Sequence, residues 1–223
     1  MGKKKLSRFE ENLTFNHLFQ RSFEQLQDGF HLKGRWHSNF FGNNNPIVLE
    51  LGCGKGEYTT GLAERYPGKN FIGIDVKGAR IWAGCKKVKE EKLKNVAFIR
   101  TRIELIEHFF GPGEVKEIWL TFSDPQPRKS RQKKRLSSPQ FLKRYSNFLA
   151  GDNLIHLKTD NRPLLDYTLE VIRQHGHTLE ALSYDVYGQG APDEVTEIQT
   201  FYEQMWREEG RTIHYLSFRM NMT

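Results

Sequence analysis

Ile47–Gly56 reads IVLELGCGKG, and this stretch decides the fold. Four of its first five residues are aliphatic, and three glycines follow in alternate positions, Gly52, Gly54 and Gly56. Glycines at a turn from strand to helix permit positive φ and let the backbone approach a ligand at the carboxyl edge of a sheet. The stretch therefore predicts a buried strand that ends in a cofactor-binding loop. A purely structural turn is the alternative for the glycines by themselves.

Short apolar runs alternate with segments of helical period after this stretch. The alternation is typical of an α/β protein with a doubly wound, mostly parallel sheet, Rossmann-like in class and covered by helices on both faces. Seven strands are expected, at residues 47–51, 71–74, 96–99, 118–122, 154–157, 179–186 and 213–218. Helices are expected at residues 58–66, 77–92, 104–110, 139–149, 163–175 and 196–209. The short connection at 209–211 predicts that the helix before it and the strand after it are antiparallel to each other.

The length of 223 residues suits one α/β domain. Residues 1–45 combine lysines with an amphipathic stretch, so we expect a short, partly helical N-terminal extension there and the main domain at 46–223. The mean hydropathy of −0.67 and the lack of an apolar run of about 18 residues exclude a membrane span. The first residues have no apolar core that could form a signal peptide, so we expect a cytoplasmic protein.

Cysteines and histidines give no indication of a disulfide or a metal. Cys53 and Cys85 are the only cysteines and form no CxxC pair. The eight histidines lack the spacing of a zinc site. We therefore expect a reduced protein without a metal, and a monomer and a homodimer both remain open.

The spacing of the glycines distinguishes between nucleotide cofactors. A dinucleotide fingerprint has its third glycine three residues after the second, but Glu57 occupies that position here. Asp75 ends the second expected strand, 21 residues beyond Gly54, where its two oxygens can accept both hydroxyls of a ribose. Glu50 ends the first strand, where it can pair with an ammonium group. The pattern ExGxGxG resembles the first motif of S-adenosylmethionine-dependent methyltransferases.

Asp124–Arg135 reads DPQPRKSRQKKR, in which one carboxylate and two prolines precede six cations. Between Asp124 and Asp152 there are eight Lys and Arg and no acidic residue; without these eight, the 34 cations fall to 26 against 27 anions. The net charge of +7 is therefore local. A local basic stripe is typical of a surface that binds nucleic acid, and a solvated charge run is the alternative.

Asp124 follows the fourth expected strand. In a doubly wound sheet, the carboxyl end of this strand points into the same crevice as the glycine loop. Pro125 and Pro127 stiffen the segment by restricting φ and the residues before them. We therefore expect one site to contain both the cofactor and a reactive carboxylate, although Asp124 could instead cap a turn.

Together the motifs resemble those of the bacterial single-chain tRNA (guanine-N7-)-methyltransferases. That family has a DPWP motif and a basic run after its fourth strand, where this chain reads DPQPRKSRQKKR. LELGCGKG, GID, KTDN at 158–161 and TFYE at 200–203 match in the same order, within residues 47–218. The resemblance implies a Rossmann-like methyltransferase that uses S-adenosyl-L-methionine to methylate N7 of a guanosine in the variable loop of tRNA.

The resemblance also implies a role for each motif residue. Asp124 is expected to be catalytic. Cofactor contacts are expected from Glu50, Gly52, Gly54, Asp75, Arg102, Ile103 and Asp124. The substrate is expected to be held by Arg128, Asp160, Thr200, Phe201, Tyr202 and Glu203, and the tRNA backbone by Lys129, Arg131, Lys133, Lys134 and Arg135.

Four positions depart from the family pattern. Gln126 replaces the tryptophan of the signature, Arg128 stands where a lysine is usual, and Arg131 stands where the family often has histidine. Arg102 stands where an aspartate would accept the adenine amino group. Because a guanidinium cannot accept a hydrogen bond, the backbone of Arg102 and Ile103, or another group, is expected to take that role. Two other functions remain open: an amino-group methyltransferase acting on adenine or a protein side chain, and an RNA-binding module with a decayed cofactor site.

Overall fold

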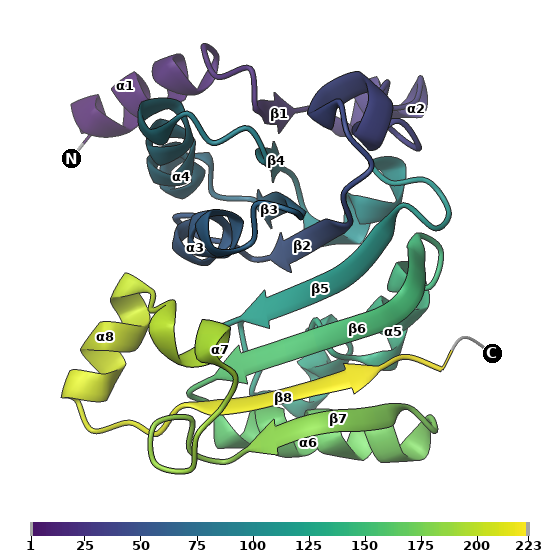
Figure 1. Cartoon of the computed structure of the whole chain (residues 1–223), viewed down its shortest axis with the longest axis vertical. Coiled ribbons are helices and arrows are strands. Elements are labelled where there is room, and N and C mark those ends of the chain that lie inside the picture. Colours follow the sequence, from purple (N-terminus) through teal and green to yellow (C-terminus); the bar gives the residue numbers. More distant parts are fainter. Residues whose placement is uncertain (1, 222–223) are drawn as a thin grey trace.

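The computed structural model describes residues 2–221, and within them one sheet of eight strands forms the centre of the protein (Figure 1). The strand order is β1-β4-β3-β2-β5-β6-β8-β7. The expected α/β class and mostly parallel sheet are confirmed, but the expected number of seven strands is wrong. The additional strand, β1 (Leu18–Gln20), pairs parallel with β4 (Val96–Arg100). With three residues, β1 is too short to give an alternating pattern.

The parallel part of the sheet contains the remaining strands up to residue 159. They are β2 (Ile47–Leu51), β3 (Asn70–Asp75), β5 (Val115–Thr121) and β6 (Leu149–Thr159). The last two strands, β7 (Thr178–Ser183) and β8 (His214–Arg219), are antiparallel to their neighbours. The expected strand 179–186 ends three residues early, at Ser183.

Three of the six expected helices, at 58–66, 77–92 and 163–175, agree with the structure to within one residue at each end. The α-helices are α1 (Gly2–Asn12), α2 (Phe23–Gln27), α3 (Glu57–Arg65), α4 (Gly78–Glu91), α5 (Pro139–Tyr145), α6 (Arg162–Gln174), α7 (Asp193–Glu197) and α8 (Phe201–Glu208). A π-helix, η1, spans His37–Phe41, and 3-10 helices span Ile103–His108 (η2) and Lys129–Lys134 (η3). The expected helix at 104–110 is thus η2, and the one at 139–149 ends at Tyr145 because β6 begins at Leu149.

The helix expected at 196–209 is two helices, α7 and α8. The break has a local cause, since Thr200 caps the amino end of α8. Its hydroxyl accepts a hydrogen bond from the Glu203 N–H at 3.2 Å, and the Glu203 carboxylate accepts one from the Thr200 N–H at 3.4 Å. This reciprocal arrangement is a capping box, which starts a new helix at Phe201.

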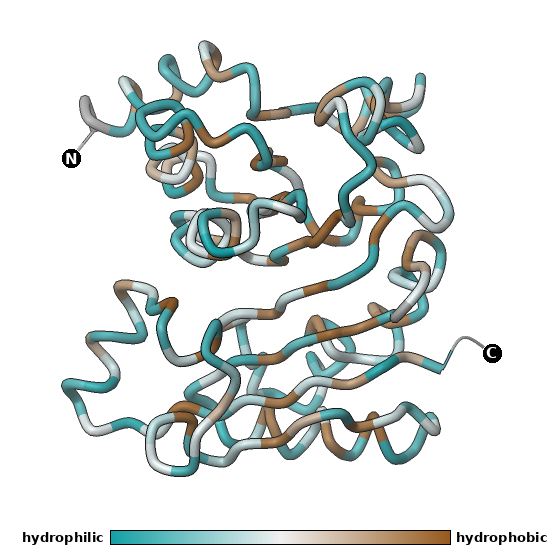
Figure 2. Tube along the Cα trace, viewed as in Figure 1, coloured by the Kyte–Doolittle hydropathy of each residue, from teal (hydrophilic) through white to brown (hydrophobic). Residues whose placement is uncertain are grey.

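The strands β2, β3, β4 and β5 divide their side chains between two apolar layers, because successive residues point to opposite faces. Leu49, Ile118 and Ile155 lie in the layer formed with α5 and α6, whereas Val48 and Trp119 lie in the layer formed with α3 and α4. Figure 2 shows the hydrophobic residues concentrated along the central strands. The sheet is therefore covered on both faces.

The same alternation places polar side chains at the carboxyl ends of three neighbouring strands. Glu50 follows Val48 on the α3 face of β2, and Thr121 follows Trp119 on β5. Lys158 of β6 is in register with Thr121. The pattern brings a carboxylate, a hydroxyl and an ammonium group to one face of the sheet, where the functional site lies.

No helix within residues 2–221 is long and apolar enough to cross a membrane. In the same part of the chain, no group of three or more His, Cys, Asp and Glu side chains is placed to hold a metal ion.

Candidate active site

A cavity of about 290 Å³ opens between the glycine loop, the carboxyl end of β5 and helix α8. Figure 1 shows α8 standing at the edge of the sheet where β2, β5 and β6 end. The cavity is lined by Glu50, Gly52, Cys53, Gly54, Lys55, Glu57, Arg80, Thr121, Phe122, Thr200, Tyr202 and Trp206. It thus brings together the first-strand motif, the end of β5 and the TFYE motif.

The glycine loop, residues 52–56, forms part of the lining of the cavity. Gly52 and Gly54 have φ of +84° and +55°, and a Cβ at either position would have no heavy atom within 4 Å. Both glycines are therefore required by conformation and leave open space for a ligand. Asp75 fixes the loop, since its carboxylate accepts hydrogen bonds from Gly54 N at 2.9 Å and from Lys77 N at 2.7 Å.

Glu50 is a buried carboxylate at the back of the cavity, with 3% of its surface exposed. It accepts hydrogen bonds from the Thr59 backbone N–H at 2.8 Å and from the hydroxyls of Thr59 and Thr121. Burial raises the pKa of Glu50 to about 7, although these hydrogen bonds oppose the increase. No basic side chain within residues 2–221 forms an ion pair with it. A buried carboxylate that faces a cavity without a counter-ion suits a cationic ligand.

Glu203, which the motif comparison placed at the substrate, is fully buried and forms an ion pair with Lys158 at 2.7 Å. The hydroxyl of Tyr187 donates a third contact to Glu203 at 2.8 Å. Burial lowers the pKa of the Lys158 ammonium, and the Glu203 carboxylate opposes this shift. Glu203 is therefore not accessible to a substrate in this structure.

Lys158 also connects the segment before α8 to the sheet. Its ammonium donates to the carbonyl oxygens of Val195 at 2.5 Å and Ile198 at 3.1 Å. One strand residue thus holds the end of α7, the turn after it and the first turn of α8. Through this anchor, Thr200 and Tyr202 are kept at the cavity.

Phe201, the remaining residue of the TFYE motif, lies at the surface. Phe201 is half exposed, and the centroid of its ring lies 4.1 Å from the ammonium nitrogen of Lys55. Its backbone N–H donates to Glu57 at 3.2 Å. Phe201 therefore packs against the glycine loop but is absent from the cavity lining.

Asp124 is exposed on the loop after β5 and lies outside the lining of the cavity. Its carboxylate accepts a hydrogen bond from the Gln126 N–H at 3.0 Å. Phe122 and Gln126, which flank Asp124, have positive φ of 49° and 44°. Residues other than glycine adopt this region at a cost and are often found at functional sites. The backbone therefore holds the loop in an unusual conformation around Asp124.

Arg135 holds this loop in place through hydrogen bonds to its backbone. It is 5% exposed, and its guanidinium donates to Pro125 O at 2.9 Å and Gln126 O at 3.3 Å while it packs 4.3 Å from the centroid of the Tyr167 ring. The expected contact with the tRNA backbone does not fit this burial. The other cations of the run, by contrast, are exposed around η3: Arg128, Lys129, Arg131, Lys133 and Lys134.

Three further expected site residues lie apart from the cavity. Arg102 has an exposed side chain beside Glu104 and, with Val76 and Phe23, lines a separate cavity of about 450 Å³. Ile103 begins η2 next to it. Asp160, after β6, accepts a hydrogen bond from Arg211 at 3.0 Å.

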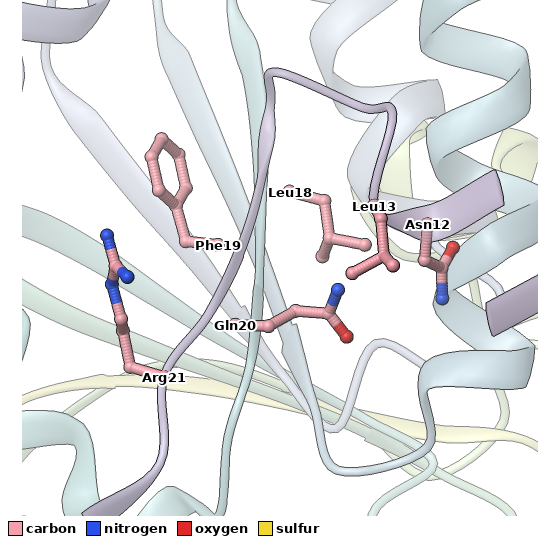
Figure 3. A pocket seen from close by; sticks show the side chains of 6 residues that line it. All are labelled: Asn12, Leu13, Leu18, Phe19, Gln20 and Arg21. Atoms are coloured by element: carbon pink, nitrogen blue, oxygen red, sulfur yellow. The ribbon is translucent and has the colours of Figure 1, made fainter. Parts of the chain in front are cut away.

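A further pocket, of about 200 Å³, lies beside β1 (Figure 3). Its lining consists of Asn12, Leu13, Leu18, Phe19, Gln20 and Arg21, none of which was an expected site residue. This pocket belongs to the N-terminal segment and is separate from the glycine loop.

Several residues of the site were not expected. Thr59 and Thr121 orient Glu50, and Trp206 lines the cavity. Lys158 had a usable signal, because a single lysine within the buried run LIHLKT requires a buried partner. The threonines had none, since their relation to Glu50 depends on strand pairing and on the angle of α3.

Two solved structures share the fold of this chain. An antibiotic-related methyltransferase aligns with a TM-score of 0.61 and 16% identity, covering 82% of this chain and 92% of its own. The 16S rRNA methyltransferase KamB aligns with a TM-score of 0.58 and 17% identity, covering 87% and 90%. This chain therefore shares a Rossmann-like α/β fold with these two structures.

Sequence comparison identifies the family of this chain. Residues 44–216 match the family described as "Putative methyltransferase". A tRNA (guanine-N(7)-)-methyltransferase of Christiangramia forsetii is 53% identical over 98% of this chain and 99% of its own. A protein of the same name from Bacteroides thetaiotaomicron is 47% identical over 99% and 87%. This chain belongs to the tRNA (guanine-N(7)-)-methyltransferase family, which confirms the resemblance of its motifs.

Proposed function

We propose that this chain transfers the methyl group of S-adenosylmethionine to N7 of a guanosine in the variable loop of tRNA. The observation that carries the proposal is Glu50, a buried carboxylate at the back of a glycine-loop cavity that forms no ion pair with any side chain the structure describes. Its neighbours fit the same reaction, since Asp124 follows the strand that borders the cavity and the exposed cations of η3 follow Asp124.

The residues of the cavity fit the amino-acid part of S-adenosylmethionine, which supplies an electrophilic methyl group on a sulfonium sulfur. Glu50 would pair with the ammonium group of the amino acid. Gly52 and Gly54 leave their backbone open to the ligand. Each oxygen of Asp75 accepts one backbone hydrogen bond, and a carboxylate has about four acceptor positions, so two remain for ribose hydroxyls.

The adenine end would lie beyond Asp75, where Val76 and Arg102 line the second cavity. The Arg102 side chain is 70% exposed and pairs with Glu104. Its guanidinium has only hydrogen-bond donors, so it cannot accept a hydrogen bond from the adenine amino group. The backbone at Arg102 and Ile103 is proposed to read the adenine instead.

Methylation at N7 needs little acid–base chemistry. N7 of guanine carries a lone pair and no proton, so attack on the methyl group requires alignment and a favourable electrostatic setting, not a general base. The product is a cationic purine, and a fixed carboxylate such as Asp124 favours positive charge developing near it. Asp124 is therefore proposed to position the base and stabilise this charge.

The exposed cations of η3 are proposed to hold tRNA phosphates: Arg128, Lys129, Arg131, Lys133 and Lys134. A base stacked within tRNA must be exposed before it can react, which costs a few kcal/mol. Phosphate contacts can offset that cost, and they make binding dependent on salt.

The decisive experiment is methyl transfer from labelled S-adenosylmethionine to bulk tRNA, followed by nucleoside analysis. 7-Methylguanosine is the expected product. Methyladenosine would favour the amino-group methyltransferase, and no methylated nucleoside would favour the RNA-binding module.

The role of Asp124 is tested separately. Asp124→Asn should lower turnover about 100-fold, as for removal of one electrostatic contact to the transition state, and should weaken cofactor binding much less. Normal turnover in that variant would contradict the role of Asp124.

The basic stripe is tested by the double variant K133E/K134E. It should raise the KM for tRNA about tenfold at low salt and reduce the salt dependence of binding. K94E/K116E is a matched control, because it makes the same change in charge with exposed lysines at the opposite end of the strands. Equal effects of the two double variants would show that only net charge matters.

A further inference from the structure

Helix α8 carries several large exposed side chains, and two of its aromatic residues border the cavity. Phe201, Tyr202 and Met205 expose 52%, 38% and 37% of their surface. Tyr202 and Trp206 are four residues apart and therefore lie on one side of the helix. Their ring centroids are 5.9 Å apart with an interplanar angle of 29°, and both residues line the cavity.

This aromatic surface extends from α8 to the loop of Asp124. The rings of Trp206 and Phe122 lie 5.0 Å apart between centroids, at an angle of 58°. Phe122 also lines the cavity and precedes Asp124 by two residues. Tyr202, Trp206 and Phe122 therefore form one wall between the cofactor cavity and the expected reactive carboxylate.

Cations border this wall. The ammonium of Lys55 lies 6.0 Å from the centroid of Tyr202, and the guanidinium of Arg80 lies 5.9 Å from it. Arg211 lies 5.8 Å from the centroid of Trp206. Aromatic faces bordered by cations are typical of proteins that stack unpaired bases and hold the adjoining phosphates.

We propose that Tyr202 and Trp206 stack against the target guanine and bind its methylated form more tightly than guanine itself. The proposal rests on the proposed function. Methyl transfer breaks the bond from sulfur to the methyl carbon and forms a bond from the N7 lone pair to that carbon. The positive charge passes from sulfur to the purine, and no proton leaves. Because aromatic faces attract cations, the wall favours this charge as it develops.

The first test measures binding through Trp206 fluorescence. Trp36 and Trp119 are buried, so Trp82→Phe leaves Trp206 as the main accessible reporter. 7-Methylguanosine monophosphate should quench the emission at concentrations about fivefold lower than guanosine monophosphate. The further change Tyr202→Leu, which keeps the Trp206 reporter, should reduce this difference. Quenching that is equal for the two nucleotides, or a difference that is unchanged without Tyr202, would overturn the proposal.

The second test measures single-turnover methyl transfer to tRNA. Trp206→Leu and Tyr202→Leu should each lower the rate about tenfold, whereas Trp206→Phe should keep most of it. Because both residues line the cavity, affinity for S-adenosylmethionine is measured in parallel, and it should fall less than the rate does. Met205→Ala is the matched control, since Met205 is exposed on the same helix and absent from the cavity lining.

The outcomes separate the two proposals. If the wild-type protein forms no 7-methylguanosine, the proposed function fails. If it does and both leucine variants match its rate, the function stands and the stacking role is wrong. Tyr202→Leu keeps the test valid if Trp206→Leu does not fold.

Discussion

Glu50 and Glu203 are two buried carboxylates on the same face of the sheet, with exposures of 3% and 0%, but their surroundings differ. Glu203 faces the ammonium of Lys158 at 2.7 Å, inside the protein. Glu50 receives hydrogen bonds only from neutral donors and faces a cavity. The difference indicates that a buried carboxylate with an internal cation stabilises structure, whereas one without it is available to bind a cation from outside.

The largest effect is expected when the internal pair is broken. Glu203→Gln leaves the Lys158 ammonium buried without a counter-ion, which costs about 3–5 kcal/mol of stability. For a chain of this length, Tm should fall by about 10 °C, measured by circular dichroism.

The double variant K158M/E203Q is the control for this prediction. Since it removes the unpaired charge as well, it should recover part of the lost stability. A single variant as stable as the wild type would mean that the pair does not anchor α8.

Glu50→Gln should have the opposite profile. Affinity for S-adenosylmethionine should fall about 100-fold, within the range for loss of one partner of a buried charge pair. The ligand-free Tm at pH 8 should stay constant or rise, because burying the ionised Glu50 is itself unfavourable. Calorimetric titration and thermal melting measure the two quantities. A fall in Tm comparable to that of Glu203→Gln would remove the distinction between the two residues.

The pH dependence of cofactor binding should reveal Glu50 next. Its pKa is raised to about 7, so the ligand-free protein holds a proton there below that pH. The ammonium of the cofactor needs the carboxylate, so affinity should fall up to about tenfold per unit as pH decreases below 7 and be constant above pH 8. In Glu50→Gln this dependence should disappear. A constant affinity in the wild type would show that Glu50 does not meet the ammonium.

The smallest effects are expected from the hydroxyls that contact each carboxylate. Thr121→Val removes a donor to Glu50, so the pH midpoint of cofactor binding should rise by about one unit with little change in the rest of the fold. Tyr187→Phe removes a donor to Glu203, so stability should fall by about 1 kcal/mol without a shift of the midpoint. A shifted pH midpoint in Tyr187→Phe, together with an unshifted midpoint in Thr121→Val, would contradict the distinction between Glu50 and Glu203.

The residues predictable from the sequence are those whose role depends on local pattern. Glu50, Gly52 and Gly54 follow from a strand that runs directly into glycines, and Asp75 follows from the end of the next strand. The strand β1 was missed because three residues cannot alternate measurably. The start of α8 had a local signal in Thr200 and Glu203, the spacing of a capping box, which the longer apolar pattern concealed.

Other features depend on contacts between distant segments and were not predictable. Lys158 and Glu203 are 45 residues apart, and their pairing requires α8 to return over the sheet. Arg135 looks like its neighbours in a basic run, and only the folded loop separates it from them. A charge pattern records composition and not the direction in which each side chain points.

Arg135 closes the segment that begins at Pro125 into a ring, because its guanidinium returns to the carbonyl oxygens of Pro125 and Gln126. The exposed cations of η3 lie within that ring, and Asp124 is the residue directly before it. Closure therefore sets a fixed distance between the place where phosphates would bind and the place where the base would react. Under the proposed function, a nucleotide whose phosphates lie at another spacing from its base would not contact both the cations and Asp124 at once.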